Sequence, residues 1–206
     1  MASSPKKSGK TKFSLYIIES LKFKDEKADR LEGKILRDIL RLSGHAVEYL
    51  YIRTRRELQV AIQRFHRSKR RYLHISCHGN PRTIRLTLDR LSFDEFASDV
   101  SPYLKNRRLF LSACAVVNEN LAKLIIPSSG CHSVIGPQES IYFDDAVLMW
   151  ASFYHLMFRD PAVDAMKGGK IRWALRRTRY AFGIEFDYFK KIDGSAGYLH
   201  VNINEK

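Results

Sequence analysis

The sequence has little cysteine and no long apolar run, and both absences narrow the possible classes of protein. Its 3 cysteines among 206 residues are too few for the disulfide framework of a small secreted protein. No stretch approaches the roughly 18 consecutive apolar residues of a membrane-spanning helix, and the N-terminus lacks an apolar secretory segment. We therefore expect a soluble, cytoplasmic protein that does not associate with membranes.

Motifs that bind metals or phosphate groups are missing as well. The sequence has no C-x-x-C pair and no glycine-rich phosphate loop. A zinc site would have to combine scattered residues, for which the ligand types are present at Cys77, His78, Cys114, Cys131 and His132. Because no C-x-x-C spacing supports such a site, we expect neither a metal nor another cofactor.

Strand-like runs alternate with amphipathic helical segments along most of the chain. Thr54-x-x-Glu57 and Ser92-x-x-Glu95 are capping boxes that each open a helix, and apolar residues recur at helical spacing over 28–42. Residues 83–88 are expected to form a small hairpin arm. The six expected strands begin at Phe13, Val47, Tyr72, Arg108, Ser133 and Tyr198. This order predicts an α/β three-layer sandwich, with a mainly parallel sheet of about six strands and helices on both faces.

No break in composition divides the chain. With 206 residues and 45% apolar content it can form one domain with a sizeable core. We assign residues 13–206 to this single domain. Residues 1–12, which are rich in Ser, Lys and Gly, are interpreted as a disordered basic tail.

Two of the strand-like runs end on reactive side chains. One ends at His78-Gly79 and the next ends at Ala113-Cys114. In an open parallel sheet the carboxyl ends of adjacent strands line one crevice, so an imidazole and a thiol would meet there. A neighbouring imidazole is the usual way to make a thiol nucleophilic at neutral pH. We therefore predict that Cys114 is a catalytic nucleophile and that His78 is its base.

Gly79 fits the same prediction. Without a side chain, the residue after the base lets a backbone N–H approach a substrate carbonyl. Together with the N–H of Cys114, the N–H of Gly79 would form an oxyanion hole.

These two motifs resemble those of the caspase-like superfamily, and most closely its CHAT branch of separase-related peptidases, which read apolar strand-x-x-His-Gly and apolar strand-Ser-Ala-Cys. Further similarity follows in the right order at the strand 133–136, at the acidic pair Asp144-Asp145 with its apolar helix, and at the helix 174–179. The resemblance covers most of residues 72–182. It implies a caspase-like three-layer fold and a cysteine endopeptidase with a His-Cys dyad and no cofactor.

The resemblance also implies a protein substrate and a controlling partner. Such enzymes cleave one or a few target proteins, often under the control of a separate regulatory or sensor protein, and small bacterial examples commonly act in immune or cell-death pathways. The chain departs from the caspases at 112–116, where Ser-Ala-Cys-Ala-Val replaces Gln-Ala-Cys-Arg-Gly. Cleavage after aspartate is therefore not implied.

A pocket for the residue before the cut is expected next to the nucleophile. Strand alternation points Ser112 to the same side as Cys114, which predicts that Ser112 lines the pocket floor. The nearest acids after the following strand are Glu139, Asp144 and Asp145. Related separases cut after arginine through an acidic pocket residue in that region. The resemblance thus favours a basic residue before the cut, with Glu139 or Asp144 as its acidic partner.

The remaining cysteines and histidines have simpler interpretations. Cys77 precedes the predicted base, so alternation points it to the opposite face, where it would pack in the core. Cys131-His132 lies at the amino end of its strand, which is the wrong end for the crevice. His74 is expected to be a core histidine.

The net charge of +14 favours a different function. Lysines and arginines gather at 64–71, at 107–108 and along 170–179, and nucleic acid is the obvious polyanionic partner. No recognised RNA- or DNA-binding motif is present, however, and basic helical faces are usually only solvated. The alternative to a peptidase is a catalytically silent caspase-like binding module, with nucleic acid or an acidic protein as its partner.

Overall fold

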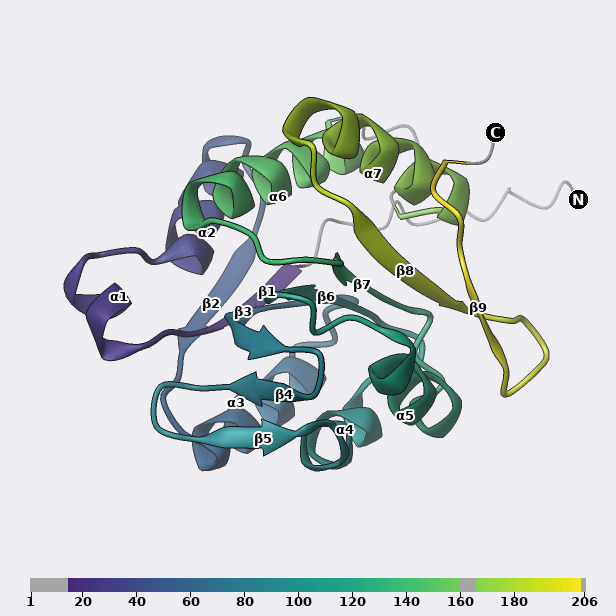
Figure 1. Cartoon of the computed structure of the whole chain (residues 1–206), viewed down its shortest axis with the longest axis horizontal. Helices are drawn as coiled ribbons and strands as arrows, with labels where there is room; N and C mark the ends of the chain where they lie inside the picture. Colours follow the sequence, from purple (N-terminus) through teal and green to yellow (C-terminus); the bar gives the residue numbers. More distant parts are fainter. Residues whose placement is uncertain (1–14, 160–165, 205–206) are drawn as a thin grey trace, which may run out of the picture.

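The computed structural model describes residues 15–159 and 166–204. The tail predicted at 1–12 lies outside the described residues. Within them, a nine-stranded mixed sheet is flanked by helices on both faces (Figure 1).

Most of the strands follow one path across the sheet. They are β1 (Leu15–Ser20), β2 (Val47–Tyr51), β3 (Tyr72–Asn80), β6 (Arg108–Ser112), β7 (Ser133–Pro137), β8 (Phe186–Lys191) and β9 (Tyr198–His200). Their order is β2-β1-β3-β6-β7-β8-β9. The strands from β2 to β7 are parallel, and β8 and β9 continue the sheet as antiparallel strands. A short arm, β4 (Thr83–Arg85) and β5 (Arg90–Ser92), extends antiparallel from the end of β3.

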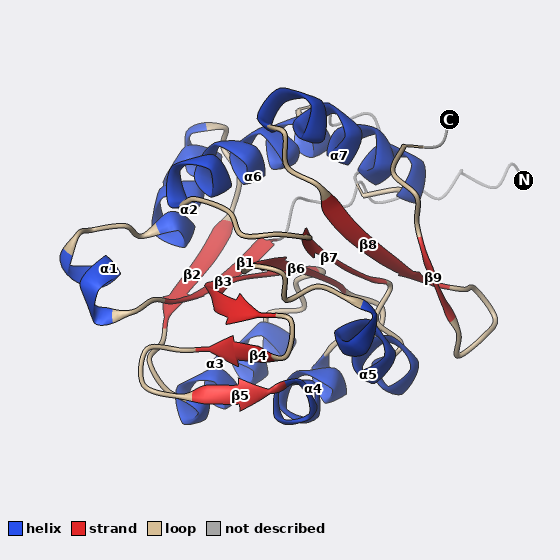
Figure 2. Cartoon of the chain, in the orientation of Figure 1, coloured by secondary structure: helices blue, strands red, loops and turns tan. Residues whose placement is uncertain are grey.

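The helices form the two outer layers (Figure 2). One face carries α2 (Glu32–Leu42), α6 (Phe143–Phe158) and α7 (Gly168–Phe182), and the other carries α3 (Arg55–Arg67), α4 (Phe93–Val100) and α5 (Glu119–Ser129). A short helix, α1 (Phe23–Lys27), follows the carboxyl end of β1, and a 3-10 turn (Ser101–Tyr103) follows α4. Across the described ranges, no helix has the length and apolar character needed to cross a membrane.

Alternation along the central strands fills two separate apolar cores. Leu73 and Ile75 of β3 pack towards α3, α4 and α5, whereas Tyr72 faces the layer of α2, α6 and α7. His74 lies on the α6 side, is fully buried and shares a hydrogen bond with the hydroxyl of Tyr154 at 3.1 Å. The prediction of a core histidine is confirmed.

The predicted α/β class, the mainly parallel sheet and the helices on both faces are confirmed. The expected number of strands, about six, is too low. Strand β8 was not predicted from the sequence. Its buried residues are Phe186, Tyr188 and Phe189, but Asp187 interrupts them and two lysines follow at the end of the strand. The last strand, β9, is only 3 residues long, and the hairpin arm continues to Ser92, beyond the predicted range 83–88.

Both predicted capping boxes are present. The hydroxyl of Thr54 accepts the N–H of Glu57 at the start of α3, and the hydroxyl of Ser92 accepts the N–H of Glu95 at the start of α4. In each case the glutamate carboxylate accepts the backbone N–H of the capping residue in return.

The buried face of α2 differs from the one that the apolar spacing over 28–42 indicates. That spacing includes Ile35 and Leu42, which are exposed, whereas Gly33 and Leu36 are buried. A Cβ on Gly33 would lie 2.9 Å from Cγ2 of Ile17, so glycine allows this face to approach β1 most closely. Apolar spacing alone could not reveal this contact.

Candidate active site at the carboxyl edge of the sheet

The carboxyl ends of β3 and β6 bring His78 and Cys114 together. The two strands are adjacent and parallel, with Ser76 opposite Ser112 in their register. Two residues later, His78 lies near the end of β3 and Cys114 lies in the turn after β6. Both line a narrow pocket of about 30 Å³. The structure therefore places the two predicted residues in one site.

Asp25 holds the imidazole of His78. This aspartate lies in α1 and is 2% exposed. Its Oδ2 lies 2.9 Å from Nε2 of His78. With Nε2 engaged, Nδ1 is the ring nitrogen that remains to exchange a proton with a thiol. The ring of Phe143, at the start of α6, packs edge-on against the imidazole with centroids 5.7 Å apart.

Sequence analysis did not identify Asp25. The available signal was its place just after the carboxyl end of β1, the strand next to β3 in the sheet. Residues at that edge converge on the same crevice. The short helix α1, which carries Asp25 back over the site, has no clear hydrophobic pattern and was not predicted.

Burial and the carboxylate of Asp25 act in opposite directions on the pKa of His78. Burial lowers the pKa of His78 below its ordinary value, and the hydrogen bond to Asp25 raises it in part. The charges of Lys22 and Arg85 lower this pKa further. The net direction is downward. Neutral imidazole, which can accept a proton, is therefore favoured at neutral pH.

Cys114 lies on a tight turn that brings it out of the core. Ala115, the next residue, has a φ of +53°, a left-handed conformation that is uncommon for residues with a Cβ. Cys114 is partly exposed, whereas Cys77 and Cys131 are buried. The accessible thiol is thus the one in the pocket with His78.

The backbone of Gly79 lies against the same turn. A Cβ on Gly79 would lie 2.1 Å from Cγ2 of Val116 and 3.1 Å from the carbonyl oxygen of Thr83. This close approach requires glycine. It places the main chain of Gly79 beside the segment that carries Cys114.

The floor of the pocket holds buried polar groups. Ser112 is 3% exposed, and its hydroxyl has no hydrogen-bond partner within the described residues. The hydroxyl of Ser76 donates to Oε2 of Glu32 at 2.8 Å. All three residues line the pocket. Ser112 thus lies in the pocket of His78 and Cys114, and its role as the floor for the residue before the cut stays a prediction. No sequence pattern distinguished Glu32 from other helix-terminal acids.

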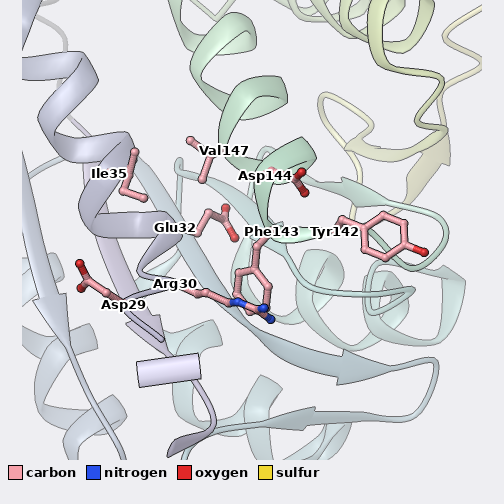
Figure 3. A pocket seen from close by; sticks show the side chains of 8 residues that line it. All are labelled: Asp29, Arg30, Glu32, Ile35, Tyr142, Phe143, Asp144 and Val147. Atoms are coloured by element: carbon pink, nitrogen blue, oxygen red, sulfur yellow. The ribbon is translucent and has the colours of Figure 1, made fainter. Parts of the chain in front are cut away.

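The other predicted acids lie outside this narrow pocket. Asp144 and Asp145 occupy the first turn of α6, where negative charge is favoured by the helix dipole. Asp144 lines a neighbouring cavity of about 460 Å³ (Figure 3). Glu139 is exposed in the loop before α6 and lines neither of these two spaces.

The remaining cysteines are structural. Cys77 packs in the apolar core on the α3 side, and burial raises the pKa of its thiol. Cys131 and His132 precede β7 at the opposite, amino edge of the sheet. Burial raises the pKa of Cys131 to about 11. In the part of the chain that the structure describes, no three His, Cys, Asp or Glu side chains gather as a group that could hold a metal ion.

No protein-family model matches the chain, and no curated protein matches it. Its function must therefore be argued from the residues and the geometry of the site.

Proposed function

We propose that this protein is a cysteine endopeptidase of the caspase-like superfamily, related to its CHAT branch, with Cys114 as nucleophile and His78 as base. The observation that carries the proposal is that adjacent strands deliver both side chains to one pocket. Two further properties support it. Cys114 is the accessible cysteine, and burial favours the neutral imidazole.

Water is the only co-reactant that the reaction needs. His78 accepts the proton of the Cys114 thiol, and Sγ bonds to the carbonyl carbon of the scissile peptide bond. His78 then donates the proton to the amide nitrogen, the C–N bond breaks, and the amine product leaves a thioester on Cys114. Water adds to the thioester carbonyl and gives a proton to His78. The C–S bond breaks, the proton returns to Sγ, and the carboxylic acid product leaves.

Backbone N–H groups would stabilise the oxyanion of both tetrahedral intermediates. The N–H of Cys114 and the N–H of Gly79 are the proposed donors. Their support is the close packing of Gly79 on the turn that follows β6. A side chain at this glycine would separate the two segments.

Asp25 acts as a positioning residue in this proposal. Its carboxylate accepts a hydrogen bond from Nε2–H of His78, which fixes the tautomer that presents Nδ1 to the thiol. It also stabilises the imidazolium that forms when the thiol loses its proton.

Cleavage assays on the full-length chain test the proposal. Cys114→Ala and His78→Ala should abolish peptide hydrolysis while leaving the circular dichroism spectrum and melting temperature near those of the wild type. Cys131→Ala is the matched control and should remain active, because this cysteine lies at the other edge of the sheet. Full activity in Cys114→Ala would contradict the proposal.

The proposal extends to the biological role that the family resemblance implies. The enzyme would act in the cytoplasm on one or a few proteins, in a bacterial immune or cell-death pathway, under the control of a separate regulatory protein. Mass-spectrometric mapping of new N-termini in cells expressing wild type or Cys114→Ala tests this. A few wild-type-specific cuts are expected, and general degradation would contradict a narrow substrate range.

A second function, nucleic-acid binding, is favoured by the charge at the amino edge of the sheet. Backbone hydrogen bonds join Arg71 to Arg108, Arg107 to His132 and His132 to Lys191. Three arginines and a lysine therefore form a row across the strands, interrupted by His132, whose pKa is lowered by burial. Such a row suits a phosphate backbone. Fluorescence anisotropy with RNA and DNA oligonucleotides should show binding that weakens with salt and with Lys191→Glu. If neither added salt nor Lys191→Glu weakens binding, this edge of the sheet is not the nucleic-acid site.

A further inference from the structure

The sheet ends at β2, and the outer side of this strand is open. Across residues 15–159 and 166–204, β2 pairs only with β1, and Figure 1 shows it at the left border of the sheet. The N–H of Ile52, just after β2, donates to the carbonyl of Glu19 in β1. Because alternate residues of a strand direct their backbone groups to opposite neighbours, those of Tyr49 and Tyr51 face outward. The edge therefore presents unpaired N–H and C=O groups.

Contacts with arginine side chains cover only the beginning of this edge. Arg70 donates to the carbonyl of Ala46 at 2.7 Å, and Arg41 donates to the carbonyl of Val47 at 3.3 Å. Such contacts block a sheet edge against a further strand. From Tyr49 onward, no backbone group on the outer side of β2 has a comparable partner within the described residues. The open part of the edge thus begins at Tyr49.

A groove of about 520 Å³ runs beside the open edge, between β2 and the carboxyl-terminal half of α3. Tyr16 and Leu50 contribute apolar lining, and Arg64 and Arg67 contribute cationic lining. Tyr49 also borders the groove, although its side chain packs on the opposite, α2 side of the sheet. Its main chain is therefore what faces this space. A segment that pairs with β2 would direct every second side chain into the groove.

The two arginines of the groove are available to an anionic partner. Arg64 and Arg67 are exposed residues three positions apart on α3, and neither side chain forms an ion pair with any residue that the structure describes. Glu48 is the acid that lines the groove, and it is already paired with Arg70 at 3.2 Å. The groove therefore carries an uncompensated positive charge, which attracts acidic side chains.

The pattern of groups on this edge indicates what kind of molecule would occupy it. Alternating N–H donors and C=O acceptors complement another peptide backbone, whereas a phosphate backbone offers acceptors alone. Residues 1–12 of this chain contain lysines and no acidic residue, so their charge opposes that of Arg64 and Arg67. A second copy that paired through β2 would bring only Glu48, which Arg70 already engages. An acidic segment of a different protein fits better than any of these.

We propose that the open edge of β2 binds an extended, acidic segment of a partner protein, which joins the sheet as a further strand. Its backbone pairs with Tyr49 and Tyr51, and its acidic side chains lie in the groove against Arg64 and Arg67. Its other side chains face the α2 side, where apolar residues contact the ring of Tyr49. The inference does not depend on the proposed peptidase function, because no residue of the groove lines the pocket of His78 and Cys114.

Fluorescence anisotropy with strand-length labelled peptides tests the proposal on the full-length chain. Glutamate and valine alternate in one peptide, and lysine replaces glutamate in the second. The glutamate peptide should bind wild type more tightly than the lysine peptide does, and Arg64→Glu should weaken its binding about tenfold. Lys123→Glu is the matched control, because it makes the same change of charge at an exposed residue of α5. This variant should bind the glutamate peptide as wild type does.

Amide hydrogen exchange tests the pairing of strands. In the free chain, the N–H groups of Tyr49 and Tyr51 should exchange faster than that of Leu50, which faces β1. The glutamate peptide should slow exchange at Tyr49 and Tyr51. A version of the peptide with N-methylated backbone, which lacks N–H donors, should bind more weakly.

Several results would overturn the proposal. They include no binding of the glutamate peptide by wild type, equal binding of the two peptides, and wild-type affinity in Arg64→Glu. Binding without slower exchange at Tyr49 and Tyr51 would place the peptide elsewhere. A dimer that protects these two amides without peptide would assign the edge to a second copy. A DNA oligonucleotide that displaces the glutamate peptide and loses affinity in Arg64→Glu would assign the groove to nucleic acid.

Discussion

Replacing Asp25 by asparagine tests how the candidate base is positioned. Asparagine has nearly the same size, so the change removes the negative charge beside His78 without leaving a cavity. The lost interaction is a hydrogen bond of 2.9 Å between a carboxylate and an imidazole, with the carboxylate 2% exposed. Hydrogen bonds to charged groups contribute roughly 1.5 to 3 kcal/mol. We therefore expect kcat/KM to fall about ten- to hundredfold.

The pH profile of the same variant distinguishes positioning from a merely structural role. Burial lowers the pKa of His78, and the hydrogen bond to Asp25 opposes this shift. Removing the charge of Asp25 therefore lowers the pKa further. Because the base must be neutral, the acid limb of kcat/KM should move to lower pH in Asp25→Asn even though the maximum rate falls.

Glu26→Gln is the matched control, because it removes a charge from the same short helix. Glu26 pairs with Arg53 at 2.8 Å, whereas the charges that shift the pKa of His78 are those of Asp25, Lys22 and Arg85. Loss of the Glu26 charge should therefore leave the acid limb in place. Two outcomes would refute the reasoning. One is wild-type activity in Asp25→Asn, and the other is a loss of activity with an unshifted acid limb.

Three further predictions concern stability. Burial above all raises the pKa of Glu19 to about 7 from an ordinary value of 4.5. The stability that depends on the neutral carboxyl is therefore fully present below pH 4.5 and is lost as pH rises through 7. Urea unfolding should show a loss of about 2.5 kcal/mol between pH 5 and pH 8 that Glu19→Gln lacks, and the same pH dependence in both proteins would contradict this. Ala115→Gly relieves a positive φ and should stabilise the fold by up to about 1 kcal/mol, with a fall in melting temperature as the contrary result. Thr54→Ala removes the cap of α3 and should cost about 1 kcal/mol in chemical unfolding, whereas no change would show that the cap is replaced by water.

Much of the fold could be predicted because local signals were strong. Both capping boxes, the burial of the β3 residues and the convergence of His78 with Cys114 follow from periodicity and from the geometry of parallel strands. Alternation correctly predicted that Cys77 packs in the apolar core on the α3 side, although this residue also borders the pocket that His78 lines. Each of these inferences depends on residues within one helix or strand, or on two adjacent strands.

The rest depended on contacts between distant segments. The buried face of α2 is set by the approach of Gly33 to Ile17, which no helical pattern encodes. Asp25 and Glu32 become site residues because the segment after β1 folds back over the ends of β3 and β6. In the sequence both are ordinary acids near helix starts. The burial of Glu32 in the pocket, and the exposure of Glu139 outside it, follow from the tertiary structure.

The central claim is that Cys114 is a nucleophile activated by His78, and covalent labelling tests it most directly. The full-length chain is treated with a peptidyl chloromethyl ketone, and the adduct is counted by intact mass and located by peptide mapping. We predict a single adduct on Cys114, none in Cys114→Ala, and much slower labelling in His78→Ala. An adduct on Cys77 or Cys131, or equal labelling rates in wild type and His78→Ala, would contradict the account.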